Sequence, residues 1–287
     1  MTNANFEVRP LATALGAEIF GLDLAEPLSA ADFDRLRAAW VRHNVVAIRD
    51  QRITPQQFLA FVRRFGAVED YPFAASVAGV PELTELLKLP GDVKGFGSGW
   101  HMDMSYRAHP PMMTILHAKE IPPAGGDTCF TSLRLARLTL SARMRGILDG
   151  LVAVHESWPP DPTRFSGMTI TNLDKPREVA RHPLVGRHPD TGEPFLFVSP
   201  YYAREIEGMS PEESHALLAF LNEHATRDEL TCRVRWEPDT IVLWDNRWTL
   251  HQALDDDFGA ILHGEGYRRR MHRAVVRDPR AAEAVEA

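Results

Sequence analysis

The fold class is decided by the closing stretch of the chain, which carries three strand-like runs: Cys232-Arg233-Val234-Arg235-Trp236, Ile241-Val242-Leu243-Trp244, and Arg270 to Val276. Further back, Val45-Val46-Ala47-Ile48 and Ile115 to Glu120 have the same short, apolar and β-branched character, which is typical of buried strands. Strands outnumber helices and do not alternate regularly with them. This organisation predicts a mainly β protein, an antiparallel double sheet with peripheral helices. The jelly roll is such a fold, and its interior is a natural pocket.

Helix starts are marked at three places by a capping residue. Ser29 is followed three residues later by Asp32, while Thr54-Pro55 and Ser210-Pro211 place proline at the first helical position. A further helical part is expected from Ser132 to about Leu151. The helix after Thr54 is expected to end at Gly66 and to carry an apolar stripe of Phe58, Phe61, Val62 and Phe65.

Other segments have the composition of loops and turns. The stretch from Tyr71 to Gly99 is rich in proline and glycine and is expected to be loop-like. Asp190-Thr191-Gly192 separates His182-Pro183-Leu184-Val185 from Phe195-Leu196-Phe197-Val198, which indicates a hairpin.

Length and composition limit the class of protein. The chain has 287 residues, 44% of them hydrophobic and 25% charged, so we expect one globular domain over residues 1–287. The formal net charge of −7 argues against a nucleic-acid partner, which needs a basic face. No apolar run is long enough to cross a bilayer, and residues 1–10 do not resemble a signal peptide. Cys129 and Cys232 do not suggest a disulfide framework, so a cytoplasmic protein is expected.

Three tripeptides have the spacing of a His-x-Asp or His-x-Glu metal motif. His188-Pro189-Asp190 runs into the turn described above, where aspartate serves turn chemistry, and His263-Gly264-Glu265 lies in a polar loop. His101-Met102-Asp103 instead follows a glycine-rich approach. In an extended backbone the side chains of His101 and Asp103 would point to the same side. His251 follows a buried strand and a short turn, so it can return to the same cavity.

His101, Asp103 and His251 together offer two imidazoles and one carboxylate. This is the donor set of non-haem Fe(II) oxygenases, and it leaves three positions of the metal open. The residues alone leave other interpretations open, because His101 and Asp103 could form a hydrogen-bonded pair at a strand end and His251 could be a buried core histidine.

Arginines near the C-terminus suggest an anion in the same cavity. If the last run is a strand, Arg269, Met271 and Arg273 face one way, and Arg268, Arg270 and His272 face the other. Arginines inside a barrel would be costly unless they met anions, which a guanidinium binds through a planar fork. Both faces carry charge, so periodicity does not decide which one is interior.

Seven stretches match a known family in its order along nearly the whole chain: Gly16-Ala17-Glu18-Ile19, Trp100-His101-Met102-Asp103, Gly125-Gly126-Asp127-Thr128, His182-Pro183-Leu184-Val185, Trp244-Asp245-Asn246-Arg247, His251, and Arg269 through Met271-His272-Arg273. On these residues the chain resembles the taurine / 2,4-dichlorophenoxyacetate dioxygenase (TauD/TfdA) family of Fe(II)- and 2-oxoglutarate-dependent oxygenases.

The resemblance implies a double-stranded β-helix, which is a jelly-roll variant. It implies that His101, Asp103 and His251 bind Fe(II), and that Thr128 and Arg269 hold the distal carboxylate of the co-substrate 2-oxoglutarate. Arg273 matches the position that meets the sulfonate in taurine-type members. The implied reaction uses dioxygen to hydroxylate a small organic anion (a sulfonate, alkyl sulfate or aryloxyalkanoate), with C–S or C–O cleavage. A homo-oligomer is expected because such assemblies are common in the family.

The chain departs from the family pattern in two places. Asp70-Tyr71-Pro72 stands where taurine-specific members carry a histidine, so we expect a bulkier or aromatic substrate that Tyr71 contacts. The segment between His251 and Arg269 is longer than in most members, so the choice of Arg269 over its neighbours depends on counting back from Met271. The candidates to line an apolar substrate pocket are Tyr71, Phe73, Met104, Tyr106 and Trp158.

Two other classes of function are compatible with a jelly roll. One is a non-catalytic protein that binds an organic anion through its arginines. The other is a zinc or manganese hydrolase or isomerase, which would need neither dioxygen nor a keto acid. Gly125-Gly126-Asp127-Thr128 together with the C-terminal arginine favours the oxygenase over both.

Overall fold

The computed structural model of the chain describes residues 6–69, 71, 73–90, 92, 95–158, 170, 172, 174–258, 262, 264 and 266–279. At its centre is an eight-stranded sheet, in which β2 and β3 pair in parallel and the other neighbours pair antiparallel. In spatial order its strands are β1 (Glu7–Pro10), β2 (Ala17–Phe20), β3 (Val45–Ile48), β14 (Ile241–Asp245), β6 (Met113–Glu120), β16 (Arg269–Val276), β5 (Val80–Lys88) and β4 (Ser76–Val77).

A second sheet of three antiparallel strands packs against one face of the first. Its strands are β13 (Thr231–Val234), β7 (Thr128–Ser132) and β15 (Thr249–Ala253). The ring of Phe130 on β7 lies 5.4 Å from the ring of Trp244 on β14, within a buried cluster that both sheets supply. The two sheets therefore enclose an interior.

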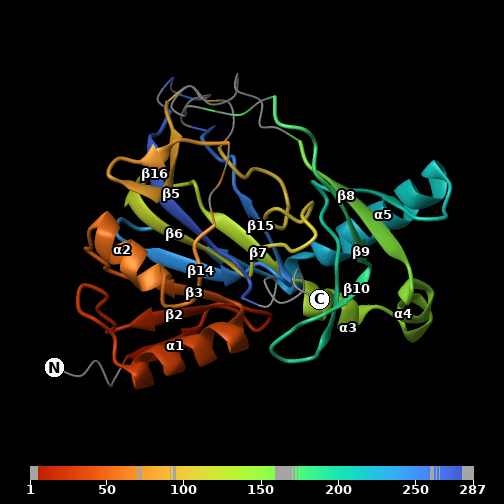
Figure 1. Cartoon of the computed structure of the whole chain (residues 1–287), viewed down its shortest axis with the longest axis horizontal. Helices are drawn as coiled ribbons and strands as arrows, with labels where there is room; N and C mark the ends of the chain where they lie inside the picture. The colour runs from red at the N-terminus through yellow and green to blue at the C-terminus, as the bar shows by residue number, and fades with distance from the viewer. Residues whose placement is uncertain are drawn as a thin grey trace.

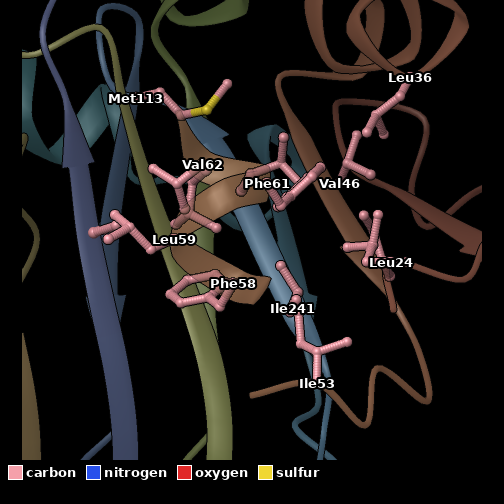
Figure 2. Packing of buried hydrophobic residues seen from close by; sticks show 14 of the residues in the cluster. Leu24, Leu36, Val46, Ile53, Phe58, Leu59, Phe61, Val62, Met113 and Ile241 are labelled. Atoms are coloured by element: carbon pink, nitrogen blue, oxygen red, sulfur yellow. The ribbon is translucent and has the colours of Figure 1, made fainter. Parts of the chain in front are cut away.

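Two helices cover the opposite face of the large sheet. Helix α1 (Ala30–His43) contacts β3 and β14, and α2 (Pro55–Val62) contacts β5 and β16 (Figure 1). Side chains of β3 alternate between the two cores, with Val46 toward the helices and Val45 toward the second sheet. Figure 2 shows Phe58, Phe61 and Val62 of α2 in the helix-side core. Burial on both faces explains why these strands read as continuous apolar runs.

The remaining elements form a layer on the far side of the second sheet, drawn in green and cyan in Figure 1. This layer contains a three-stranded sheet, a two-stranded ribbon, three helices and a 3₁₀ turn in the described part of the chain. They are β12 (Ala203–Ile206), β8 (Val152–Glu156) and β9 (Val179–Pro183); β10 (Val185–Arg187) and β11 (Pro194–Leu196); α3 (Leu133–Thr139), α4 (Ala142–Leu148) and α5 (Pro211–Ala225); and η2 (Asp228–Leu230).

The mainly β prediction with peripheral helices is confirmed, as are three helix starts. The Ser29 hydroxyl accepts from the Asp32 amide, and Thr54 and Ser210 form complete capping boxes. One helix end was predicted wrongly: helix α2 ends at Val62, so Phe65 lies beyond it. The helical part expected from Ser132 to about Leu151 is present as two short helices, because Ser141 caps the second one.

Two further predictions need correction. The stretch from Tyr71 to Gly99 contains β4 and the nine-residue β5, which the Pro81 ring and alternating polar residues disguise in sequence. In the hairpin around Asp190-Thr191-Gly192 only Val185–Arg187 pairs with Pro194–Leu196, since His182 and Pro183 belong to β9. No helix in the described part of the chain is long and apolar enough to span a membrane.

Candidate metal centre

His101, Asp103 and His251 come together between the eight-stranded sheet and the second sheet. One ligand atom from each lies within 4.8 Å of the others, and all three residues are buried. The centres of the two imidazole rings lie 4.1 Å apart. Each Nε2 is 3.7 Å from a different oxygen of Asp103, which is too far for a hydrogen bond.

A pair of backbone hydrogen bonds sets this arrangement. The His101 amide donates to the His251 carbonyl at 3.0 Å, and the His251 amide donates back at 2.9 Å. His251 lies on β15, a strand that the sequence analysis did not predict. The expected extended backbone from His101 to Asp103 is only partly present, because a turn begins at Asp103 and Met104 adopts a left-handed φ of 50°. Asp103 therefore reaches the site from a turn and not from a strand.

The protonation states favour metal binding. His101 Nδ1 lies 2.9 Å from the Gly99 carbonyl oxygen, so Nδ1 donates and Nε2 keeps its lone pair toward Asp103. Burial lowers the pKa of both His101 and His251. Both are therefore neutral near pH 7, which is the form that binds a metal.

Asp103 is held ionised inside the protein. Burial opposes its charge, but the Arg273 guanidinium, the two imidazoles and the Thr114 hydroxyl outweigh burial and hold the pKa of Asp103 well below its ordinary range. Arg273 Nη2 lies 2.8 Å from Oδ1, and Thr114 Oγ1 donates to Oδ2 at 2.6 Å. Two neutral imidazoles and one carboxylate, converging without bonding one another, fit the requirements of an Fe(II) ion.

Thr128, Arg269 and Arg273 line the same pocket as the three candidate ligands. Arg269 is buried, and its Nε has no hydrogen-bond partner among the described residues. Burial lowers the pKa of Arg269 to about 10, so it stays charged near pH 7. A buried guanidinium that lacks a hydrogen-bonded anion is costly unless an anion binds it.

The structure also places the two neighbouring arginines. Arg268 and Arg270 both pair with Glu120 outside the pocket. The face that carries Arg269, Met271 and Arg273 is therefore the interior one, a choice that periodicity left open.

Sequence reasoning missed a residue that joins the anion-facing groups. Trp236 Nε1 donates to Thr128 Oγ1 at 2.9 Å, and the Arg269 guanidinium lies 5.6 Å from the Trp236 ring centre. Only the folded chain shows this role, because a buried tryptophan beside a strand usually reads as core packing.

Four of the five candidates to line the apolar substrate pocket lie near Arg273. The Arg273 guanidinium lies 4.8 Å from the centre of the Tyr71 ring, which packs edge-on against Phe73. Met104 and Tyr106 belong to the same buried cluster as Tyr71. Trp158 does not join them, since it is 39% exposed and its ring stacks against Arg177.

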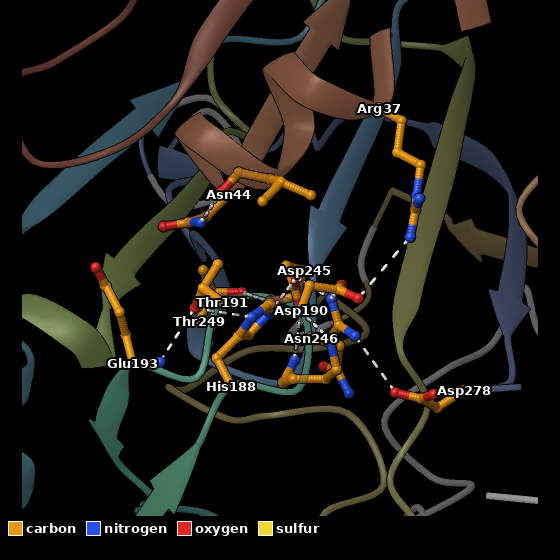
Figure 3. A network of polar contacts seen from close by, with 12 residues as sticks. Arg37, Asn44, His188, Asp190, Thr191, Glu193, Asp245, Asn246, Thr249 and Asp278 are labelled. Atoms are coloured by element: carbon orange, nitrogen blue, oxygen red, sulfur yellow. Dashed lines mark hydrogen bonds and ion pairs between the residues drawn. The ribbon is translucent and has the colours of Figure 1, made fainter. Parts of the chain in front are cut away.

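The two other motif matches have different outcomes. His188 Nε2 bonds a buried Asp245 oxygen at 2.9 Å, and Asp190 forms an ion pair with Arg247. His188 and Asp190 therefore belong to a buried polar network as well as to the turn, because His188 bonds Asp245 and Asp190 pairs with Arg247. Figure 3 shows His188 and Asp190 beside Asp245. His263 and Glu265 lie outside the described residues, as do Asp70, Pro72 and Ile261.

Comparisons with known proteins agree with this geometry. Residues 7–275 match the sequence model of the "Taurine catabolism dioxygenase TauD, TfdA family". The chain is 33% identical to an alpha-ketoglutarate-dependent sulfate ester dioxygenase of Pseudomonas putida, over 87% of this chain and 84% of the relative. It is 32% identical to an (S)-phenoxypropionate/alpha-ketoglutarate-dioxygenase of Sphingobium herbicidovorans, over 88% and 90%. A crystal structure of a putative alpha-ketoglutarate-dependent taurine dioxygenase from Burkholderia xenovorans superposes with a TM-score of 0.80 and 38% identity, over 95% of this chain and 92% of that one.

Proposed function

This chain belongs to the TauD/TfdA family, and from that premise we propose how its central pocket carries out the reaction. The protein is an Fe(II)- and 2-oxoglutarate-dependent dioxygenase that acts on a small organic anion. One observation carries the assignment of residues: a single pocket gathers His101, Asp103, Thr128, His251, Arg269 and Arg273.

In this proposal His101, Asp103 and His251 hold Fe(II), which with 2-oxoglutarate supplies the activation of dioxygen. Thr128 and Arg269 bind the distal carboxylate of 2-oxoglutarate. The Nε of Arg269 supports this role. It has no hydrogen-bond partner in the part of the chain that the structure describes, and it offers a buried donor at the end of the pocket away from the metal ligands. Charge-assisted hydrogen bonds of this kind orient a carboxylate strongly.

Arg273 orients the substrate. Its Nη2 is bonded to Asp103, while its Nη1 is buried without a partner among the described residues. An oxyanion bound at Nη1 would be held beside the metal ligands, so the adjacent C–H would face the reacting centre. Tyr71 packs over the same guanidinium and supports a substrate whose anionic group carries an apolar or aromatic part, such as an aryloxyalkanoate or alkyl sulfate. Hydroxylation next to oxygen or sulfur would then lead to C–O or C–S cleavage.

The alternatives from other classes are less well supported. An anion-binding protein explains Arg269 and Arg273 but not the converging donor set. A zinc or manganese hydrolase explains the donor set but not family membership.

Several broader proposals accompany the assignment. Two facing sheets with the pocket between them support the double-stranded β-helix form of the jelly roll. We propose one domain over residues 1–287, of which the family match spans 7–275. We expect a homo-oligomer, to be checked by light scattering after gel filtration. The free thiols of Cys129 and Cys232 support a reducing, cytoplasmic location.

The test is succinate release from 2-oxoglutarate by Fe(II)-loaded protein across a panel of sulfonates, alkyl sulfates and aryloxyalkanoates. We expect one class to stimulate release, and His101→Ala to abolish it. Succinate release by His101→Ala at the normal rate would show that the metal site is elsewhere.

A further inference from the structure

Asn246 is a fully buried amide whose side chain bonds the main chain of Asp103 from both sides. The Asp103 amide donates to Asn246 Oδ1 at 2.8 Å. Asn246 Nδ2 donates to the Asp103 carbonyl at 2.9 Å and to the Pro111 carbonyl at 3.1 Å. The side chain thus contacts the peptide groups of a proposed metal ligand as a neighbouring strand would.

Asp103 needs such a contact because it lies at the start of a turn. Its neighbour His101 is fixed by backbone bonds to β15, but the left-handed φ at Met104 takes the chain away from that strand. In the described part of the chain, Asp103 belongs to no strand ladder. Asn246 supplies the two bonds that a ladder would have supplied.

The turn that carries Asn246 is itself held rigidly. Asp245, which is fully buried, bonds the His188 ring and forms an ion pair with Arg247. Arg247 also pairs with Asp190 and Asp278. Figure 3 shows His188, Asp190 and Asp245 beside Asn246. The same turn leads directly into β15, which carries His251.

We propose that Asn246 is a positioning residue: it fixes the Asp103 main chain so that the Asp103 carboxylate faces His101 and His251. This inference rests on the proposed function, because it assumes that Asp103 is a metal ligand. Groups that orient a ligand without touching the metal commonly change metal affinity 10- to 100-fold when they are replaced.

The test uses Mn(II) as a stand-in for Fe(II). Asn246→Asp keeps the shape and one acceptor but places a carboxylate oxygen against the two carbonyls, and Asn246→Ala removes all three bonds. Asn44→Gly is the matched control. Asn44 is a buried asparagine whose carbonyl accepts from the Asp245 amide. Its side chain donates to the Val41 carbonyl, and its φ of 63° suits glycine.

The measurements are the melting temperature without metal, the Mn(II) dissociation constant, and the visible absorption of the Co(II)-loaded protein. We expect both Asn246 variants to weaken Mn(II) binding about tenfold or more and to alter the Co(II) spectrum. Asn44→Gly should lower the melting temperature but leave affinity and spectrum unchanged. A purely structural role would make the Asn246 variants behave like this control.

The outcomes separate the two hypotheses. If His101→Ala abolishes Mn(II) binding while both Asn246 variants bind as tightly as the unchanged protein, the positioning role is wrong and the proposed function stands. If the unchanged protein does not bind Mn(II) or Fe(II), the proposed function is wrong, and this inference fails with it. Should Asn246→Ala not fold, the isosteric Asn246→Asp variant still decides the question.

Discussion

At the scale of single residues, Arg269 gives a direct prediction, because its buried Nε has no hydrogen-bond partner among the described residues. Replacing Arg269 by Gln removes the charge and the fork that would bind the distal carboxylate of 2-oxoglutarate. A charge-assisted hydrogen bond contributes about 1.5–3 kcal/mol, so we expect the KM for 2-oxoglutarate to rise roughly 10- to 100-fold. Steady-state kinetics at saturating substrate and Fe(II) would measure it.

Arg270→Gln is the control for this experiment, because Arg270 pairs with Glu120 outside the pocket. Its KM for 2-oxoglutarate should stay within about twofold of the unchanged protein, because this half-buried ion pair does not line the pocket. If the KM rose strongly for Arg270→Gln but not for Arg269→Gln, the carboxylate would bind the opposite face of β16. The proposed role of Arg269 would then be wrong.

These arginines also show the limit of prediction from single residues. The seven stretches that match the family single out His101, Asp103 and His251, whereas the His-x-Asp spacing alone does not, because two other tripeptides of the chain share that spacing or its glutamate version. They do not distinguish Arg269 from Arg268 and Arg270. The distinction comes from Glu120, which lies 148 residues from Arg268 in the chain and meets it only after β6 and β16 pair.

At the scale of elements, Asp255 and Asp256, which follow β15, bond two glycine-containing segments beside the pocket. Asp255 Oδ1 accepts from the Gly95 amide and the Ser98 hydroxyl, and Asp256 Oδ1 accepts from the Gly126 amide. Gly126 lies against Arg269, since a Cβ there would be 3.3 Å from the Arg269 Cδ atom. Asp256 therefore acts on the anion end of the pocket through Gly126.

We predict that Asp256→Ala raises the KM for 2-oxoglutarate about 3- to 10-fold, because Gly126 loses a partner and the groove beside Arg269 loosens. Mn(II) affinity should not change, since the metal ligands lie at the other end. Asp256→Asn keeps the acceptor for the Gly126 amide, so its KM for 2-oxoglutarate should stay close to that of the unchanged protein. An equal loss in both variants would point to the Arg233 ion pair of Asp256 instead.

Local signals decided which elements the sequence could predict. Helices α1, α2 and α5 are capped by Ser29, Thr54 and Ser210, whose side chains bond backbone amides only three residues away. Strand β5 was missed because its burial is created by pairing with β16 at the other end of the chain. Strand β15 was missed because Thr249–Ala253 is short and half polar, and it is defined by pairing with β7.

At the scale of the whole molecule, several buried histidines outside the metal centre are held uncharged. His117 on β6 and His272 on β16 are directly paired in the central sheet, and His155 lies on β8 in the far layer. Burial lowers the pKa of His117 and His272 to about 4, and that of His155 to about 3. Lys119 adds to the effect at His117 and His272.

These shifts predict that the folded protein loses stability in mild acid. The unfolded chain takes up these protons near pH 6.5, whereas folded His117 and His272 do so only near pH 4. The contribution of these histidines to stability is therefore complete above pH 6.5 and falls as the pH decreases toward 4, by at most about 3 kcal/mol for each histidine.

Urea unfolding of the metal-free protein at several pH values would measure the slope of the free energy of unfolding against pH. The double variant His117→Gln/His272→Gln should flatten it, and His215→Gln, at an exposed position of α5, should not. An unchanged slope in the double variant would mean that other groups govern the acid lability of the fold.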